Sequence, residues 1–169
     1  MGDGWLRCVT DANLWIDLLY GEMAANAFRL PWEFMAPDVV IAEILLPLSW
    51  DLSGMGLIEK ELPGSGVLKV GELVTKYPRP GRIDLFSLVL AIQEDALLLT
   101  GDEALRKAAS KEGVDVHGTL WLLDEMIEGG AISEAEGYRS LELMVNAGRR
   151  LPKKEVSTRM AAWRSAKRQ

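Results

Sequence analysis

The chain has 169 residues, of which 49 % are hydrophobic and 26 % charged, and its net charge is −6 at pH 7. This length suits one globular domain, and no apolar run approaches the roughly 18–20 residues of a membrane span. The single cysteine, Cys8, excludes an internal disulfide framework and a thiolate zinc cage, and we interpret it as a small buried hydrophobe. The amino-terminal residues do not resemble a signal peptide, so we expect a cytoplasmic protein without membrane contact.

The first half of the chain alternates apolar runs of strand length with longer segments of helical period, which is typical of βαβ units on a parallel sheet. Proline at position 37 followed by aspartate indicates the start of a helix. The expected elements are, in order, a strand at 6–10, helices at 12–20 and 22–29, a strand at 34–36, a helix from Asp38 to near Pro47, and β-like pieces at 57–60 and 67–70.

The second half continues this alternation. Its expected elements are a helix at 71–77, a helix at 85–93 opened by Asp84, a strand at 96–100, a helix at 103–112, a strand at 114–117, helices at 119–128 and 133–147, and a basic helix after Pro152. We therefore predict an α/β fold with three layers, in which a central, mostly parallel sheet is flanked by helices. The expected division is a compact domain over residues 1–150 and a basic helix or arm over residues 151–169.

The charge is distributed unevenly along the chain. Residues 139–169 contain nine basic and two acidic residues and carry +7, so residues 1–138 carry −13. A basic arm on an acidic body is consistent with a contact to nucleic acid or to an acidic partner. A solvated helix face explains the same charges equally well, and both interpretations stay open at this point.

Four carboxylates lie where the predicted scaffold turns polar. Asp11 and Asp102 each follow a predicted strand, whereas Glu43 and Asp84 lie on predicted helices. Functional groups of open parallel sheets gather beyond the carboxyl ends of the strands, so the two strand-end aspartates share a crevice if their strands are neighbours. An oxygen-only set without His or Cys favours Mg²⁺ or Mn²⁺ over zinc, and such an ion serves phosphoryl transfer.

Each aspartate of this set also has a structural interpretation, because an aspartate before a helix caps free backbone amides. For any one aspartate alone, capping is the more frequent role. Glu43 lies in the middle of an apolar helix, where burial of an unpaired carboxylate is costly, and we expect it to need a function. The only histidine, His117, excludes a two-histidine ribonuclease mechanism.

Four short stretches carry a family resemblance through their order and spacing: Cys8–Asn13 with Ile16–Leu19, Ala36–Ile44, Ile83–Ala91 continuing to Leu98–Asp102, and Val116–Leu120. Together they resemble the PIN-domain ribonucleases, in particular the VapC-type toxins of bacterial and archaeal toxin–antitoxin pairs. The segment 48–82 and the residues beyond 150 lie outside these motifs.

This resemblance implies a compact sheet flanked by helices, with an acidic pocket that holds Mg²⁺ or Mn²⁺. The family's acidic positions fall on Asp11, Glu43, Asp84 and Asp102. By the same comparison, Asn13 and Thr100 are polar neighbours that orient a ligand or a metal-bound water. The implied reaction is endonucleolytic cleavage of RNA by metal-activated water.

A toxin of this class is expected to bind a small antitoxin protein, and exposed apolar helices offer surfaces for that partner or for a homodimer. Two other functions compete with it. One is a catalytically inactive PIN-like module that binds RNA or protein through its basic tail. The other is a small phosphatase, which the absence of a paired Asp-x-Asp after the first strand disfavours.

Overall fold

A computed structural model describes residues 5–167 of the chain, with the backbone alone described for 44–47, 166 and 167. Its centre is a five-stranded sheet with the order β3-β2-β1-β4-β5. All neighbouring strands are parallel. The strands are β1 (Leu6–Thr10), β2 (Trp32–Pro37), β3 (Ile58–Lys60), β4 (Leu97–Leu99) and β5 (Val116–His117).

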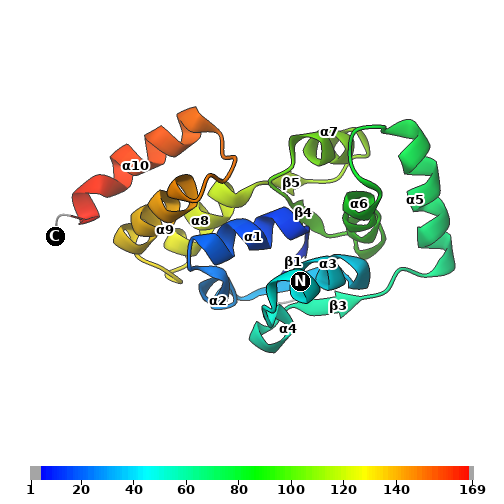
Figure 1. Ribbon diagram of the computed structural model, residues 1–169, viewed down its shortest axis with the longest axis horizontal. Helices are drawn as coiled ribbons and strands as arrows, with labels where there is room; N and C mark the ends of the chain where they lie inside the picture. The colour runs from blue at the N-terminus through cyan, green and yellow to red at the C-terminus, as the bar shows by residue number, and fades with distance from the viewer. Residues whose placement is uncertain (1–4, 168–169) are drawn as a thin grey trace.

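Helices cover both faces of this sheet (Figure 1). They are α1 (Ala12–Tyr20), α2 (Ala24–Ala27), α3 (Asp38–Leu48), α4 (Leu52–Met55), α5 (Gly64–Lys76), α6 (Arg82–Glu94), α7 (Glu103–Lys111), α8 (Thr119–Glu128), α9 (Glu134–Asn146) and α10 (Lys153–Lys167). Among the described residues, no helix is long and apolar enough to cross a bilayer.

The strands supply side chains to two separate cores, one on each face of the sheet. On β1, Cys8 packs with residues of α1, α8 and α9, whereas its neighbour Val9 packs with residues of α5, α6 and α7. The same alternation holds on β4, where Leu97 and Leu99 face the first core and Leu98 the second. Successive strand residues point to opposite faces, so continuous apolar runs produce a sheet buried on both sides. The predicted three-layer α/β fold is confirmed.

The strand order places the ends of β1 and β4 side by side. The chain runs outward from β1 through β2 to β3, then returns to form β4 on the other side of β1. Thr10 is in register with Leu99, and the amide of Asp11 donates to the carbonyl of Leu99 at 3.2 Å. This reversal of strand order is the position where open parallel sheets bind ligands.

Three local predictions differ from the structure. The β-like piece expected at 67–70 is wrong, because these residues lie within α5, where Val70 and Leu73 are buried and Leu68 is exposed. A short apolar run fits a strand and a helix equally well, and here the spacing of Val70 and Leu73 on one helix face decides. The helix expected at 22–29 is reduced to α2, and the short helix α4 was not predicted.

The carboxyl-terminal helix α10 packs on the body of the domain. Val156 and Trp163 are buried in the core beside α9. Arg159 donates to Asp124 of α8, with a distance of 2.7 Å between Nη2 and Oδ2. The predicted basic helix therefore exists and is attached along its length, whereas Arg168 of the basic run lies outside the described residues.

Candidate active site

Asp11 is the most deeply placed of the four predicted acids. It follows β1 as the N-cap of α1 and is fully buried. Its Oδ1 accepts the amide of Leu14 at 3.0 Å, and its Oδ2 accepts the hydroxyl of Thr100. Burial raises the pKa of Asp11 to about 7, and the charges of Asp84 and Asp102 act in the same direction against the two hydrogen bonds. Asp11 therefore caps helix α1, and its ionised form is disfavoured by burial and by the charges of Asp84 and Asp102.

Thr100 connects the two strand ends. Besides donating to Asp11, its Oγ1 accepts the amide of Asp102 at 3.0 Å. Asp102 is half-buried and caps α7, with its Oδ1 accepting the amide of Leu105 at 2.7 Å. One buried hydroxyl thus links the turn after β1 to the turn after β4.

The two acids on helices lie farther out. Asp84, half-buried in the first turn of α6, accepts the amide of Gly81 at 3.1 Å. Its pKa is raised by burial and by the charge of Asp102. Glu43 is exposed on α3, which corrects the expectation that it is buried, because the helix turns Val40 and Ile41 toward the core instead. Partial loss of solvent and the charge of Asp84 still raise the pKa of Glu43.

The four carboxyl groups form one electrostatic set. Asp84 raises the pKa of Asp11 and of Glu43, and Asp102 raises the pKa of Asp11 and of Asp84. Like charges that oppose each other's ionisation are relieved by a bound cation, and oxygen ligands fit a hard divalent ion. Within residues 5–167, however, no three His, Cys, Asp or Glu side chains are placed to hold a metal ion in this conformation. The oxygen donors fit Mg²⁺ or Mn²⁺ in chemistry, whereas their present arrangement does not surround an ion.

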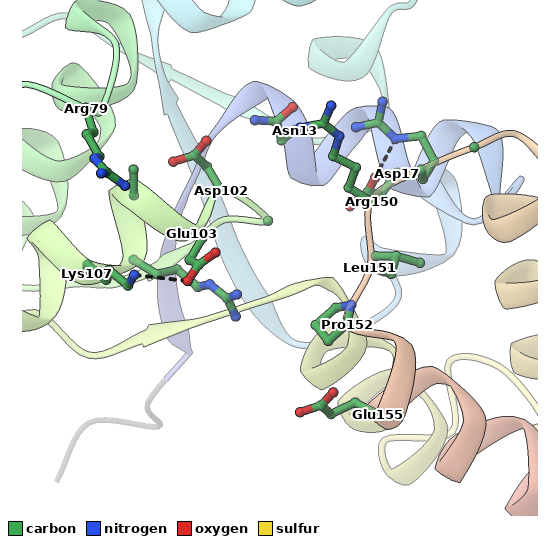
Figure 2. A pocket seen from close by; sticks show the side chains of 15 residues that line it. Asn13, Asp17, Arg79, Asp102, Glu103, Lys107, Arg150, Leu151, Pro152 and Glu155 are labelled. Carbon is green, nitrogen blue, oxygen red and sulfur yellow. Dashed lines mark hydrogen bonds and ion pairs between the residues drawn. The ribbon is translucent and has the colours of Figure 1, made fainter.

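A hollow of about 990 Å³ opens beside Asp102. Asn13 of α1 also lines it, whereas Asp11, Glu43 and Asp84 do not. Figure 2 shows Asp102 between Arg79 and Lys107 on one side and Arg150 on the other. Sequence analysis counted Arg150 in the basic run of residues 139–169 but missed Arg79 and Lys107, because they come from other segments of the chain and belong to no motif.

The comparisons with known proteins address the family. A model of the DUF3368 family, described as a PIN domain, matches residues 8–165, from β1 into α10. The chain belongs to the PIN-domain family. PIN domains are generally nucleases, so membership of this family indicates a nuclease-type function. No curated protein matches the chain significantly.

A solved structure supports the same fold. This PIN domain is similar to a PilT N-terminus domain protein from the hyperthermophilic archaeon Sulfolobus solfataricus P2, with a TM-score of 0.53 and 14 % sequence identity. The likeness covers 73 % of this chain and 95 % of that protein. At this identity the comparison shows the fold alone.

The PIN domain also holds an aspartate that sequence analysis assigned no role. Asp17 of α1 has a side chain only 3 % exposed, and its Oδ1 accepts Nε of Arg149 at 2.6 Å. Its Oδ2 accepts the hydroxyl of Thr119 at 2.7 Å. The sequence signal was an acid on the same helix face as the buried Leu14 and Leu18, which requires a partner for its charge. The partner lies 132 positions away and was not deducible.

Proposed function

We propose that this PIN domain is a metal-dependent endoribonuclease and that its acid set holds Mg²⁺ or Mn²⁺. The supporting observation is Asp11, a fully buried carboxylate whose pKa is raised to about 7 beside two further acids. Among the described residues, no cationic side chain forms an ion pair with it. Such perturbed groups concentrate at functional sites.

In this proposal each residue has a distinct task. The ligands of the ion are Asp11, Glu43, Asp84 and Asp102. Thr100 holds Asp11 and the Asp102 backbone in register, and Asn13 orients the substrate or a water at the hollow. A divalent ion, when bound, withdraws charge from a phosphate oxygen and lowers the pKa of a bound water. The cations around the hollow balance the charge of the phosphodiester backbone.

The test is cleavage of a panel of RNAs in Mg²⁺ or Mn²⁺ by wild type, Asp11→Asn and Asp51→Asn. Asp51 is the matched control, since it caps α4 by accepting the amide of Gly54 at 2.8 Å and does not belong to the acid set. We expect wild type and Asp51→Asn to cleave and Asp11→Asn to be inactive. Full activity of Asp11→Asn, or cleavage that persists in EDTA, would overturn the proposal.

One observation favours a second candidate, a catalytically inactive PIN-like module that binds RNA or protein. In the part of the chain that the structure describes, no three metal-ligating side chains already surround one point. An inactive module binds RNA without cleaving it in Mn²⁺, and it loses binding when residues 149–169 are deleted. A ribonuclease cleaves under the same conditions.

The assignment as the toxin of a toxin–antitoxin pair is part of the same proposal and is supported by the sequence resemblance alone. Induced expression of wild type is then expected to stop growth of a bacterial host, whereas Asp11→Asn does not. Co-expression of the small protein encoded next to this chain's gene is expected to restore growth. Normal growth during verified expression of active wild-type protein would remove the toxin assignment and leave the nuclease assignment intact.

A further inference from the structure

We propose that the segment Gly148–Pro152 forms one wall of a cleft for single-stranded RNA. In this cleft Arg150 binds a backbone phosphate, and Arg149 positions Arg150. The choice of RNA as occupant rests on the proposed ribonuclease function, whereas the wall and its cation rest on the structure.

The cleft is built from segments distant in sequence. The hollow of about 990 Å³ is lined by α1, by Arg79, by the turn before α7 with the first residues of that helix, and by Gly148–Pro152 with Glu155. In Figure 2, Arg150, Leu151 and Pro152 lie across the hollow from Arg79 and Lys107, with Asp102 between the two sides. Glu103 and Glu155 also line the hollow, and Glu103 pairs with Lys107. The cations left for a phosphodiester near Asp102 therefore include Arg79 on one side and Arg150 on the other.

Like Arg79 and Arg106, and unlike the paired cations around the hollows, Arg150 forms no ion pair among the described residues. Lys107 forms an ion pair with Glu103 at 3.0 Å, and Arg159 forms one with Asp124 at 2.7 Å. Arg150 is exposed, and no described residue forms an ion pair with it. A guanidinium without a carboxylate partner keeps its planar donors available for a phosphate.

Arg150 also lines a second hollow of about 250 Å³ together with Arg106 and His117. Gly101 and Leu151 belong to the lining of both hollows, so the two adjoin at these residues. In the proposed cleft the strand extends past Asp102 toward β5.

Arg149 fixes the wall to the body of the domain. Its Nε donates to Asp17 at 2.6 Å, and its guanidinium lies 5.9 Å from the centre of the Tyr20 ring. Asp17 is held from its other oxygen by Thr119, so the pair cannot shift without leaving a buried charge. Gly148, with φ of +79°, reverses the chain just before Arg149. Because Arg149 anchors the adjoining backbone, Arg150 loses less conformational entropy when it binds a phosphate.

A single strand is the occupant that this arrangement favours over a duplex. The backbone must bend inward between the two walls to approach Asp102, and a duplex is stiff, with a persistence length of about 50 nm in DNA. An acidic peptide satisfies the cations but not the acids of the site, whose charges are relieved by a phosphate-bound divalent ion.

The first test measures binding of a fluorescein-labelled single-stranded oligoribonucleotide by anisotropy over a series of salt concentrations, in EDTA so that no cleavage occurs. Each phosphate neutralised contributes about 0.7 to the slope of log affinity against log salt. We expect Arg150→Gln to lower the slope by about 0.7. The matched control is Arg164→Gln, an exposed arginine of α10 that lines neither hollow, and its slope should equal that of wild type. An unchanged slope in Arg150→Gln overturns the wall assignment.

The second test is a double-mutant cycle on the positioning residue. Arg149→Lys keeps the charge but changes the geometry at Asp17, and we expect it to weaken RNA binding by about threefold or more when Arg150 is present. In the Arg150→Gln background the same change should have no further effect. Equal weakening in both backgrounds indicates a purely structural role and contradicts the positioning proposal.

These tests are separable from the nuclease proposal. Salt-dependent RNA binding that is sensitive to Arg150, without any cleavage in Mn²⁺, supports the proposed wall and contradicts the nuclease proposal. If Arg150→Gln changes neither the KM of cleavage nor the salt slope of RNA binding, the nuclease proposal stands and the proposed wall is contradicted. A duplex or an acidic peptide that competes as well as the single strand contradicts the assigned occupant.

Discussion

Two buried aspartates of helix α1, Asp11 at its N-cap and Asp17 within the helix, have different partners. Asp17 is paired with Arg149 at 2.6 Å and accepts a hydroxyl from Thr119. Asp11 accepts only an amide and a hydroxyl, and two further acids raise its pKa to about 7 together with burial. Asp17 therefore has a cationic partner within the fold, whereas no cation among the described residues pairs with Asp11. The absence of an internal cation destabilises the ionised form of Asp11, and we propose that an ion from solution takes that place.

The largest expected change in stability comes from removing the ion-pair partner of Asp17. Arg149→Ala leaves Asp17 charged and buried, and removal of one partner of a buried pair costs about 3–5 kcal/mol. Urea unfolding at pH 7 measures the change in the free energy of unfolding. A loss below about 1 kcal/mol, the range of surface pairs, means that solvent reaches Asp17 and that the contrast with Asp11 is weaker than described.

At Asp11 we expect the opposite effect, a substitution that increases the free energy of unfolding. The folded pKa of Asp11 is about 7 and lies above the ordinary value of 3.8 for an aspartate, so the folded state binds the proton more tightly than the unfolded state. Stability is therefore lost as pH rises from about 4 to about 7. Asp11→Asn keeps an acceptor for the Leu14 amide and removes the charge, so above pH 7 without metal it should be more stable than wild type, by at most about 4 kcal/mol.

Unfolding of both proteins at pH 5 and pH 8 measures this difference. We expect the gain of Asp11→Asn over wild type to be larger at pH 8. A variant that is less stable than wild type at both pH values would mean that the Asp11 charge is stabilised within the fold.

An intermediate effect concerns the hydroxyl between the two strand ends. Thr100→Val removes the donor to Asp11 and leaves the amide of Asp102 without its acceptor. The expected loss is about 1–3 kcal/mol, the cost of an unsatisfied buried polar group. Because the Thr100 hydrogen bond lowers the pKa of Asp11, this variant should also shift the pH dependence of unfolding to higher pH. If Thr100→Val leaves the free energy of unfolding unchanged, the hydroxyl of Thr100 does not stabilise the two strand ends.

The smallest effect is expected at the rim of the hollow. The ion pair of Lys107 with Glu103 joins side chains that are 67 % and 75 % exposed, where solvent and salt screen the attraction. Lys107→Gln should leave the unfolding midpoint unchanged within experimental error. A clear destabilisation by this variant would show that the exposed cations of the cleft are structural, contrary to their proposed role toward RNA.

Local patterns carried most of what the sequence predicted about the fold. The runs that became β1 and β4 are each followed by an aspartate, and the rule for open parallel sheets then placed Asp11 and Asp102 at one edge. Capping and site membership, which we treated as alternatives for these aspartates, are compatible, because the carboxyl edge of a strand is also the start of the next helix. Whether the acids act in catalysis stays a prediction.

The errors arose where a decision needed tertiary information. Glu43 was expected to be buried from its neighbours in sequence, but which face of α3 packs inward depends on the elements around it. The run at 67–70 lacked a strand partner, and α5 formed instead. The contact between Asp17 and Arg149 joins residues 132 positions apart, and no periodicity in a single sequence reports such a pair.

The most direct measurement of the central claim is thermal unfolding at pH 7.5 with and without Mn²⁺, for wild type, Asp102→Asn and the cap control Asp51→Asn. Binding to the folded state alone stabilises by about 2.7 kcal/mol when the ion is at 100 times its dissociation constant. We predict stabilisation of wild type and Asp51→Asn, and little or none of Asp102→Asn. Equal stabilisation of all three proteins, or of none, would contradict the proposal that these acids bind one cation.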